Sequence, residues 1–193
     1  TFAMSEALTI ILKRNDPTAA AKQVSLTELG SIKINKEERG KMYKTIPRSS
    51  VIGFLIGVLP GAGATIASFL AYGMERNLVK DEEKEKFGKG SVNGLSAPET
   101  ANNAACSGSF VPMLTLGIPG SGTTAVMLGA LLGFGIQPGP RLYMTNPEIF
   151  WSVIMSMYIG MVILLILNLP LIPYIARILA VPKNYLIPLI LFF

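Results

Sequence analysis

The chain has 193 residues, of which 50% are hydrophobic and 15% charged, and its formal net charge is +5 at pH 7. One cysteine and no histidine exclude a disulfide framework, the usual zinc ligand sets and a histidine-activated nucleophile. The basic residues lie beside apolar segments and form no basic face interleaved with aromatics, so they indicate orientation in a membrane and not a nucleic-acid partner. No acid–base pair is recognisable, and an enzyme is not expected.

The first two segments are predicted to be the end of a membrane helix and a loop. Residues 1–12 have the composition of a helix whose beginning is missing, so the chain is interpreted as a fragment of a larger membrane protein. Residues 13–48 hold nine basic and four acidic residues. By the positive-inside rule they are predicted to form a cytoplasmic loop, in which one short helix or hairpin can occur.

Residues 49–72 carry no charge but are interrupted by LPGAGAT at 59–65. Proline and glycine disfavour a helix interior. Because residues 13–48 and the charged residues 74–90 are both expected in the cytoplasm, the run is predicted to enter the membrane, turn and leave. Each arm of such a re-entrant hairpin would be roughly 16 Å long, about half a bilayer. A single kinked span is the alternative.

Residues 73–105 are predicted to form a solvated cytoplasmic helix followed by a polar loop. The loop contains APETANNAA at 97–105. A carboxylate and amides near membrane depth suit a coupling cation or a substrate carboxylate, so Glu99 is the ion-coupling candidate, and Asn102 and Asn103 are substrate-binding candidates. The alternative is an interfacial turn that caps a helix.

The remaining segments alternate between apolar runs and connections. Residues 106–135 are predicted to form a broken transmembrane helix, and residues 136–149 an external connection. The uncharged run 150–169 has the length of a transmembrane helix. Residues 170–193 are predicted to form a loop and the start of a further transmembrane helix.

Two similar motifs, PGAGAT at 60–65 and PGSGTT at 119–124, match at four of six positions. Broken helices in corresponding repeats point to the binding site of a transporter. The half-helix that starts at each break presents free N–H groups, which suit an anion, whereas the carbonyls that end the preceding half-helix suit a cation such as sodium. The predicted substrate-binding residues in the two motifs are Pro60, Gly61, Gly63, Thr65, Pro119, Gly120, Ser121, Gly122, Thr123 and Thr124.

Close helix packing is the competing explanation for several glycines. Gly53, Gly57 and Gly61 recur every four residues, as do Gly129 and Gly133, and such spacing is typical of helix contacts in membranes. A nucleotide-binding loop fits poorly, because neither motif has the lysine of a Walker A sequence or the third glycine of G-x-G-x-x-G.

Three stretches together resemble the large membrane subunit of the tripartite tricarboxylate transporters, the TctA family. They are LIGVLPGAGATIASFLAY, APETANNAACSGSFVPMLTLGIPGSGTTAVMLGALL and IQPGPRL. The similarity runs from about residue 2 to residue 193 and corresponds to the C-terminal half of the family. The resemblance implies a carrier in the bacterial inner membrane that works with a small membrane subunit and a periplasmic solute-binding protein. Such a carrier takes up citrate or a related carboxylate with an ion gradient.

The sequence therefore predicts an all-α polytopic membrane protein with discontinuous or re-entrant helices and an internal PGxGxT repeat. The predicted function is secondary active transport of an organic polyanion by alternating access. No cofactor is expected, apart from Na⁺ or H⁺ as a coupling ion. The alternative function is a structural membrane subunit that does not itself transport.

Overall fold

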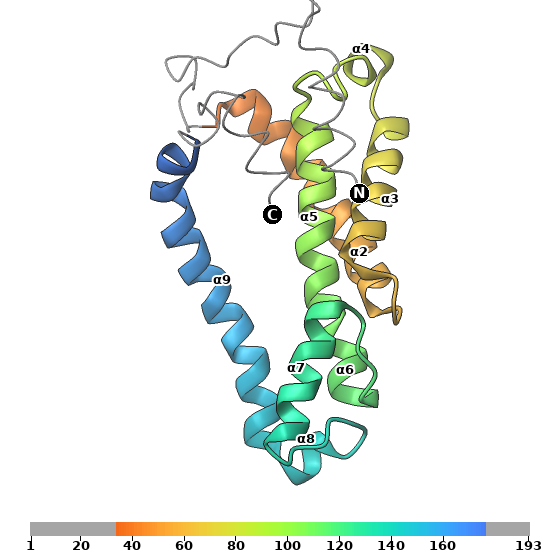
Figure 1. The fold of residues 1–193 in the computed structure, drawn as a ribbon. Helices are drawn as coiled ribbons and strands as arrows, with labels where there is room; N and C mark the ends of the chain where they lie inside the picture. Colours follow the sequence, from red (N-terminus) through yellow and green to blue (C-terminus); the bar gives the residue numbers. More distant parts are fainter. Residues whose placement is uncertain (1–33, 177–193) are drawn as a thin grey trace, which may run out of the picture. The chain divides into compact units, whose positions relative to one another are not determined.

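The computed structural model describes residues 34–176 (Figure 1). The predictions for residues 1–12, and for the parts of 13–48 and 170–193 beyond these limits, lie outside the described residues. Within them the chain forms eight helices and no strand, so the all-α class is confirmed for this part. Residues 34–159 belong to one compact unit and residues 160–176 to a second.

Helix α2, Lys36–Val58, begins inside the segment that was predicted to be a loop. Its start is fixed by a capping box, in which the Asn35 side chain accepts from the Glu38 N–H and the Glu38 carboxylate accepts from the Asn35 N–H, both at 2.9 Å. The helix continues through Pro47 into the apolar run. The loop prediction is therefore wrong for residues 36–48, where the capping box starts a helix ahead of the proline.

The polar residues that follow are also more helical than predicted. Helix α3, Gly63–Leu78, and the short helix α4, Asp81–Lys84, take up the charged segment. Helix α5, Val92–Gly108, then occupies the predicted polar loop, and its first turn is capped by the Ser91 hydroxyl, which accepts from the Gly94 N–H at 3.1 Å. Small polar residues form a helix here because one of its faces is packed against α2 and α3.

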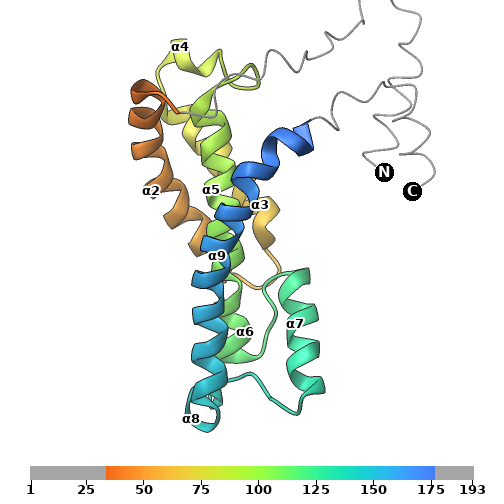
Figure 2. The ribbon, with the colours of Figure 1, turned by 90° about the vertical axis from the view of Figure 1, so that its left-hand side faces the viewer.

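Helices α2, α3 and α5 lie side by side and are joined by stripes of small residues (Figures 1 and 2). A Cβ atom on Gly53 would lie 2.6 Å from Ala101 Cα, and one on Gly57 would lie 2.8 Å from the carbonyl carbon of Ala105. The packing explanation is confirmed for these two glycines. The buried residues of the stripes are Thr45, Ser49, Gly53 and Gly57 in α2, Ala67, Ala71 and Glu75 in α3, and Asn93, Ala97, Ala101 and Ala105 in α5.

An apolar cluster holds the next elements together. Helix α6, Phe110–Leu116, is followed by α7, Gly122–Gly133, and by α8, Leu142–Thr145, within the predicted connection. The buried members of the cluster come from these helices and from the first turns of α9. They are Met113, Leu114, Leu131, Leu142 and Val153.

Helix α9, Pro147–Ala176, contains the apolar run predicted to be a transmembrane helix. Its segment Pro147–Ile172 contains an 18-residue window with a mean hydropathy of 2.4 and is the only stretch among the described residues that is long and apolar enough to cross a membrane. Its 26 residues span about 39 Å, compared with about 30 Å for a hydrocarbon core.

Candidate substrate and ion site

The first helix break separates α2 from α3 and divides the apolar run 49–72 between them. Gly61 and Gly63 have φ values of +79° and +68°, which residues with a Cβ rarely adopt, so the turn requires glycine at both positions. The Leu59 N–H donates to the Ile56 carbonyl at 3.1 Å, which closes the last turn of α2. Pro60 lies within the turn. The hairpin's placement in a membrane stays a prediction.

Thr65 lies in the first turn of α3. No side chain caps this helix. The Thr65 side chain is exposed and its hydroxyl has no hydrogen-bond partner among residues 34–176. The start of α3 therefore offers free backbone N–H groups and one free hydroxyl to a ligand.

The second helix break, between α6 and α7, is built differently. Gly117, with φ +72°, ends α6 in the left-handed conformation. Ser121 and Thr124 then form a capping box for α7: the Ser121 N–H donates to Thr124 Oγ1 at 2.8 Å, and the Thr124 N–H donates to Ser121 Oγ at 3.2 Å. These two hydroxyls act within the helix start, whereas the exposed Thr123 hydroxyl has no partner in the described part of the chain.

The end of α2 and the second break both lie against the junction of α5 and α6. A Cβ on Gly108 would lie 2.6 Å from the Phe54 carbonyl oxygen and 3.2 Å from the Gly57 carbonyl carbon, just before the first break. A Cβ on Gly120, within the second break, would lie 2.9 Å from Ser109 Cβ. The last turns of the helix that leads into the first motif, and the second motif itself, thus lie against adjoining residues of one helix junction.

A polar face of α5 leads away from this junction. Glu99, Asn102, Asn103 and Cys106 are exposed, and their spacing of three and four residues puts them on one side of the helix, away from its buried alanines. The Asn103 amide donates to the Glu99 backbone carbonyl at 3.1 Å, and the Cys106 thiol lies 3.6 Å from Asn102 Oδ1. The Glu99 carboxylate and the Asn102 NH₂ group have no partner among the described residues.

The distances along α5 separate the candidates. At about 1.5 Å per residue, Asn102 and Asn103 lie about 9 Å along the axis from the junction, and Glu99 lies about 14 Å from it. The two asparagines are therefore closer to the helix breaks than the ion-coupling candidate is.

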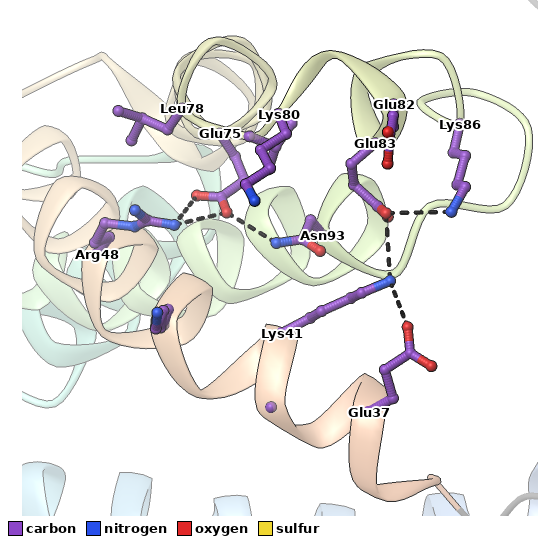
Figure 3. A pocket seen from close by; sticks show the side chains of 13 residues that line it. Glu37, Lys41, Arg48, Glu75, Leu78, Lys80, Glu82, Glu83, Lys86 and Asn93 are labelled. Carbon is purple, nitrogen blue, oxygen red and sulfur yellow. Dashed lines mark hydrogen bonds and ion pairs between the residues drawn. The ribbon is translucent and has the colours of Figure 1, made fainter.

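A buried carboxylate, Glu75, was missed by the sequence analysis. Its Oε1 accepts from Thr45 Oγ1 at 2.7 Å. Figure 3 shows its other partners: Oε1 also accepts from Asn93 Nδ2 at 3.0 Å and from Arg48 Nη2 at 2.8 Å, and Oε2 lies 2.9 Å from the same Arg48 nitrogen. It was assigned to a solvated helix because it stands among charged residues. The available signal was its four-residue spacing from Ala71, which continues the small-residue stripe.

A second ion-pair group joins α2 to α4. Lys41 Nζ lies 3.2 Å from a Glu37 oxygen and 3.3 Å from a Glu83 oxygen. Hydrogen bonds to Glu37 and Glu83 raise the pKa of Lys41. Partial burial acts to raise the pKa of Glu83, but hydrogen bonds from Lys41 and Lys86 outweigh it and the pKa is lowered. Residues 34–176 contain no group of three or more His, Cys, Asp or Glu side chains that could hold a metal ion.

Broken helices that converge on one junction, next to a polar helix face and together with an apolar helix of spanning length, are features of a membrane transporter subunit. The family model described as "Tripartite tricarboxylate transporter TctA family" matches residues 1–193, and the chain belongs to this family. The family consists of transporter subunits and not of enzymes.

Two relatives come from Agrobacterium vitis. One, described as "Uncharacterized 52.8 kDa protein in TAR-I ttuC' 3'region", is 40% identical over 180 residues, which are 93% of this chain and 36% of the relative. The other, "Uncharacterized protein in TAR-II ttuC' 3'region", is 47% identical over 141 residues, which are 73% of this chain and 57% of the relative. The chain therefore spans between about one third and just over half of their lengths. No solved structure matches it.

Proposed function

We propose that the chain is part of the large subunit of a secondary transporter that takes up citrate or a related tricarboxylate or dicarboxylate. A Na⁺ or H⁺ gradient drives uptake, and a small membrane subunit and a periplasmic solute-binding protein complete the system in the bacterial inner membrane. Membership of the TctA family supports the transporter class. The observation that carries the site is that the end of α2, just before the first break, and Gly120, within the second break, lie against the adjoining residues Gly108 and Ser109.

Neutral donors would bind the carboxylates in this proposal. The exposed hydroxyls of Thr65 and Thr123, and the N–H groups of the helix starts around them, supply hydrogen bonds to oxygen anions. Asn102 and Asn103 add amides from the polar face of α5. The prolines and glycines of the two motifs shape the backbone so that the helix ends are open to a ligand.

Binding by dipoles and not by a buried arginine suits a carrier, which has to release its substrate. Glu99 is proposed to hold the coupling cation on the same face of α5, where the positive charge of the ion offsets part of the negative charge of the carboxylates. Movement of the helix breaks against the rest of the protein would expose the site to the two sides of the membrane in turn.

The test uses threonine-to-valine variants of the full-length protein, reconstituted with its partners. Thr65→Val and Thr123→Val remove only a free hydroxyl and keep the shape of the side chain. We expect each to lower the uptake of labelled citrate at least about tenfold, because a hydrogen bond to a charged group contributes about 1.5–3 kcal/mol. Thr115→Val is the matched control, since its hydroxyl donates to the Val111 carbonyl at 2.7 Å within α6.

Equal uptake by all three variants, at equal amounts in the membrane, would reject the site. If Asn102→Ala also matched the unsubstituted protein in the assembled system, the structural-subunit alternative would be favoured.

A further inference from the structure

A cavity of about 560 Å³ lies between the N-terminal half of α2, the end of α3 and the turn that contains α4 (Figure 3). It is separate from the junction of α5 and α6. Five basic and four acidic side chains line it, and only the charges that are not already paired within the protein are free to bind a ligand.

Three of the acids are engaged within the protein. Glu75 accepts from Arg48, and both Glu37 and Glu83 pair with Lys41. The fourth acid, Glu82, is exposed.

Three cations keep free donors toward the cavity. Lys44 and Lys80 line it and have no hydrogen-bond or ionic partner among residues 34–176. Arg48 uses only Nη2 for Glu75, and its side chain is 41% exposed. Three cationic groups with unused N–H donors around one hollow favour an anion with several oxygens.

The cavity lies at the end of the apolar part of the hairpin. Residues 49–74 carry no charge, and Arg48 and Glu75 are the first charged residues on either side of them. Leu78, an exposed apolar side chain at the end of α3, lines the cavity. In a membrane subunit, this change from apolar to charged residues marks the height of the lipid head groups.

We propose that this cavity binds the phosphate group of an anionic phospholipid. Lys44, Lys80 and the free guanidinium nitrogens of Arg48 would hold the phosphate oxygens, and the exposed Leu78 side chain would contact the start of an acyl chain. Basic pockets between membrane helices are known lipid head-group sites. The proposal does not depend on the transported substrate.

General attraction between basic residues and a membrane surface is the competing explanation. It depends on the number of lysines and not on the cavity. Lys36 and Lys89 are exposed, have no partner among the described residues and do not line the cavity, so they provide a control with the same change of charge.

The experiment measures lipids that remain bound to the full-length protein after extraction from vesicles of phosphatidylcholine with one fifth phosphatidylglycerol, counted by native mass spectrometry. The protein is compared with the double variants Lys44→Gln/Lys80→Gln and Lys36→Gln/Lys89→Gln. We expect retained phosphatidylglycerol in the unchanged protein and in the control. In the Lys44→Gln/Lys80→Gln variant, the affinity for phosphatidylglycerol should fall about 25-fold, about fivefold for each lysine, so that this lipid is no longer retained. All four residues are exposed, and equal melting temperatures would show that the variants fold.

Two results would overturn the proposal. Equal loss of phosphatidylglycerol in the two double variants would show that net charge alone matters. Binding of inorganic phosphate or citrate to lipid-free protein in detergent, with the same dependence on Lys44 and Lys80 and without any enrichment of phosphatidylglycerol, would show a site for a free anion.

Discussion

Glu75 is the only ionisable side chain that the described residues bury completely, and it connects three helices. Its carboxylate accepts from Thr45 and Arg48 in α2 and from Asn93 in α5. Removing one partner of a buried pair leaves the other groups without compensation. Removal of Glu75 would leave Arg48 unpaired. Because Arg48 is partly exposed and water can hydrate it again, we expect the loss of stability to be at the lower end of the range for broken buried ion pairs.

We predict that Glu75→Ala destabilises the full-length protein by about 3 kcal/mol. The measurement is the melting temperature of the protein in detergent. Glu82→Gln is the control, because Glu82 is exposed and has no partner in the described residues, and its effect should be within about 0.5 kcal/mol. Similar melting temperatures for the two variants would contradict the role of Glu75.

The Lys41–Glu83 pair predicts a dependence of stability on pH. Because the pKa of Glu83 is lowered below its ordinary value of 4.5, its contribution is present above pH 4.5 and is lost as the pH falls through the folded-state pKa. The pKa of Lys41 is raised, so its contribution is lost only above its ordinary value of 10.5. The ion pair therefore stabilises the fold fully between pH 4.5 and pH 10.5, a range that includes neutral pH.

Glu83→Gln should therefore lower the melting temperature slightly at pH 7, and the difference from the unchanged protein should shrink as the pH falls below 4.5. The effect is small because both groups are partly exposed. Glu85→Gln, at an exposed neighbour without a partner among the described residues, should show no such dependence on pH. A difference between Glu83→Gln and the unchanged protein that did not shrink as the pH fell would argue against the ion pair.

At the scale of the elements, the contact of α2 with α5 depends on the absence of side chains. A methyl group at Gly53 would meet the backbone of Ala101, which cannot move without the whole helix. A methyl group at Gly73 in α3 would have no neighbouring atom within 4 Å, and Gly73 is in an ordinary helical conformation, so it offers the matched control.

We predict that Gly53→Ala destabilises the protein by about 1–3 kcal/mol through overpacking. Gly73→Ala should instead be neutral or stabilising by up to about 1 kcal/mol, because alanine favours a helix. Melting temperatures of the two variants in detergent make the comparison. A Gly53→Ala protein as stable as Gly73→Ala would show that α2 and α5 do not pack as described.

The cap of α7 gives a second prediction at this scale. Ser121→Ala removes a hydroxyl that accepts from the Thr124 N–H, and it should lower stability by about 1 kcal/mol. Thr123→Val should leave stability unchanged, since its hydroxyl has no partner among the described residues. If Thr123→Val had the lower melting temperature of the two, Thr123 would have the structural role and Ser121 would be the candidate for ligand binding.

The sequence predicted the positions of the helix breaks better than the extent of the helices. Proline and two glycines define each break locally, and Gly61 and Gly63 have the backbone that only glycine adopts readily. Helix α5 was not predicted, because its polar residues are weak helix formers and are held by packing against α2 and α3. Residues 36–48 were predicted to be a loop from their charges, whereas the capping box of Asn35 and Glu38 starts a helix there.

At the scale of the whole molecule, the parts of the proposed site are brought together by the fold. The end of α2 and the second break lie against Gly108 and Ser109 through contacts far apart in the sequence, and no local pattern predicts them. The same applies to Glu75, whose partners come from 18 to 30 residues away. The family could be predicted because its motifs are long continuous stretches.

We predict that vesicles carrying the full-length subunit with its small partner and the binding protein accumulate labelled citrate or a related carboxylate when an ion gradient is imposed. Uptake that follows a sodium gradient at constant pH would assign sodium as the coupling ion. Glu99→Gln should then weaken the dependence on sodium more than the affinity for the carboxylate. Uptake that equilibrates without accumulation would contradict secondary active transport.

The most direct test of the central claim uses Cys106, which is exposed on the polar face of α5 close to the junction. In a full-length protein with Cys106 as its only cysteine, we would measure the rate of labelling by a hydrophilic thiol reagent with and without di- and tricarboxylates. A transported carboxylate should slow labelling of Cys106 and leave unchanged a control cysteine introduced by Gly73→Cys with Cys106→Ser. If a carboxylate that the protein transports left the labelling of Cys106 unchanged, the junction of α5 and α6 would not be its binding site.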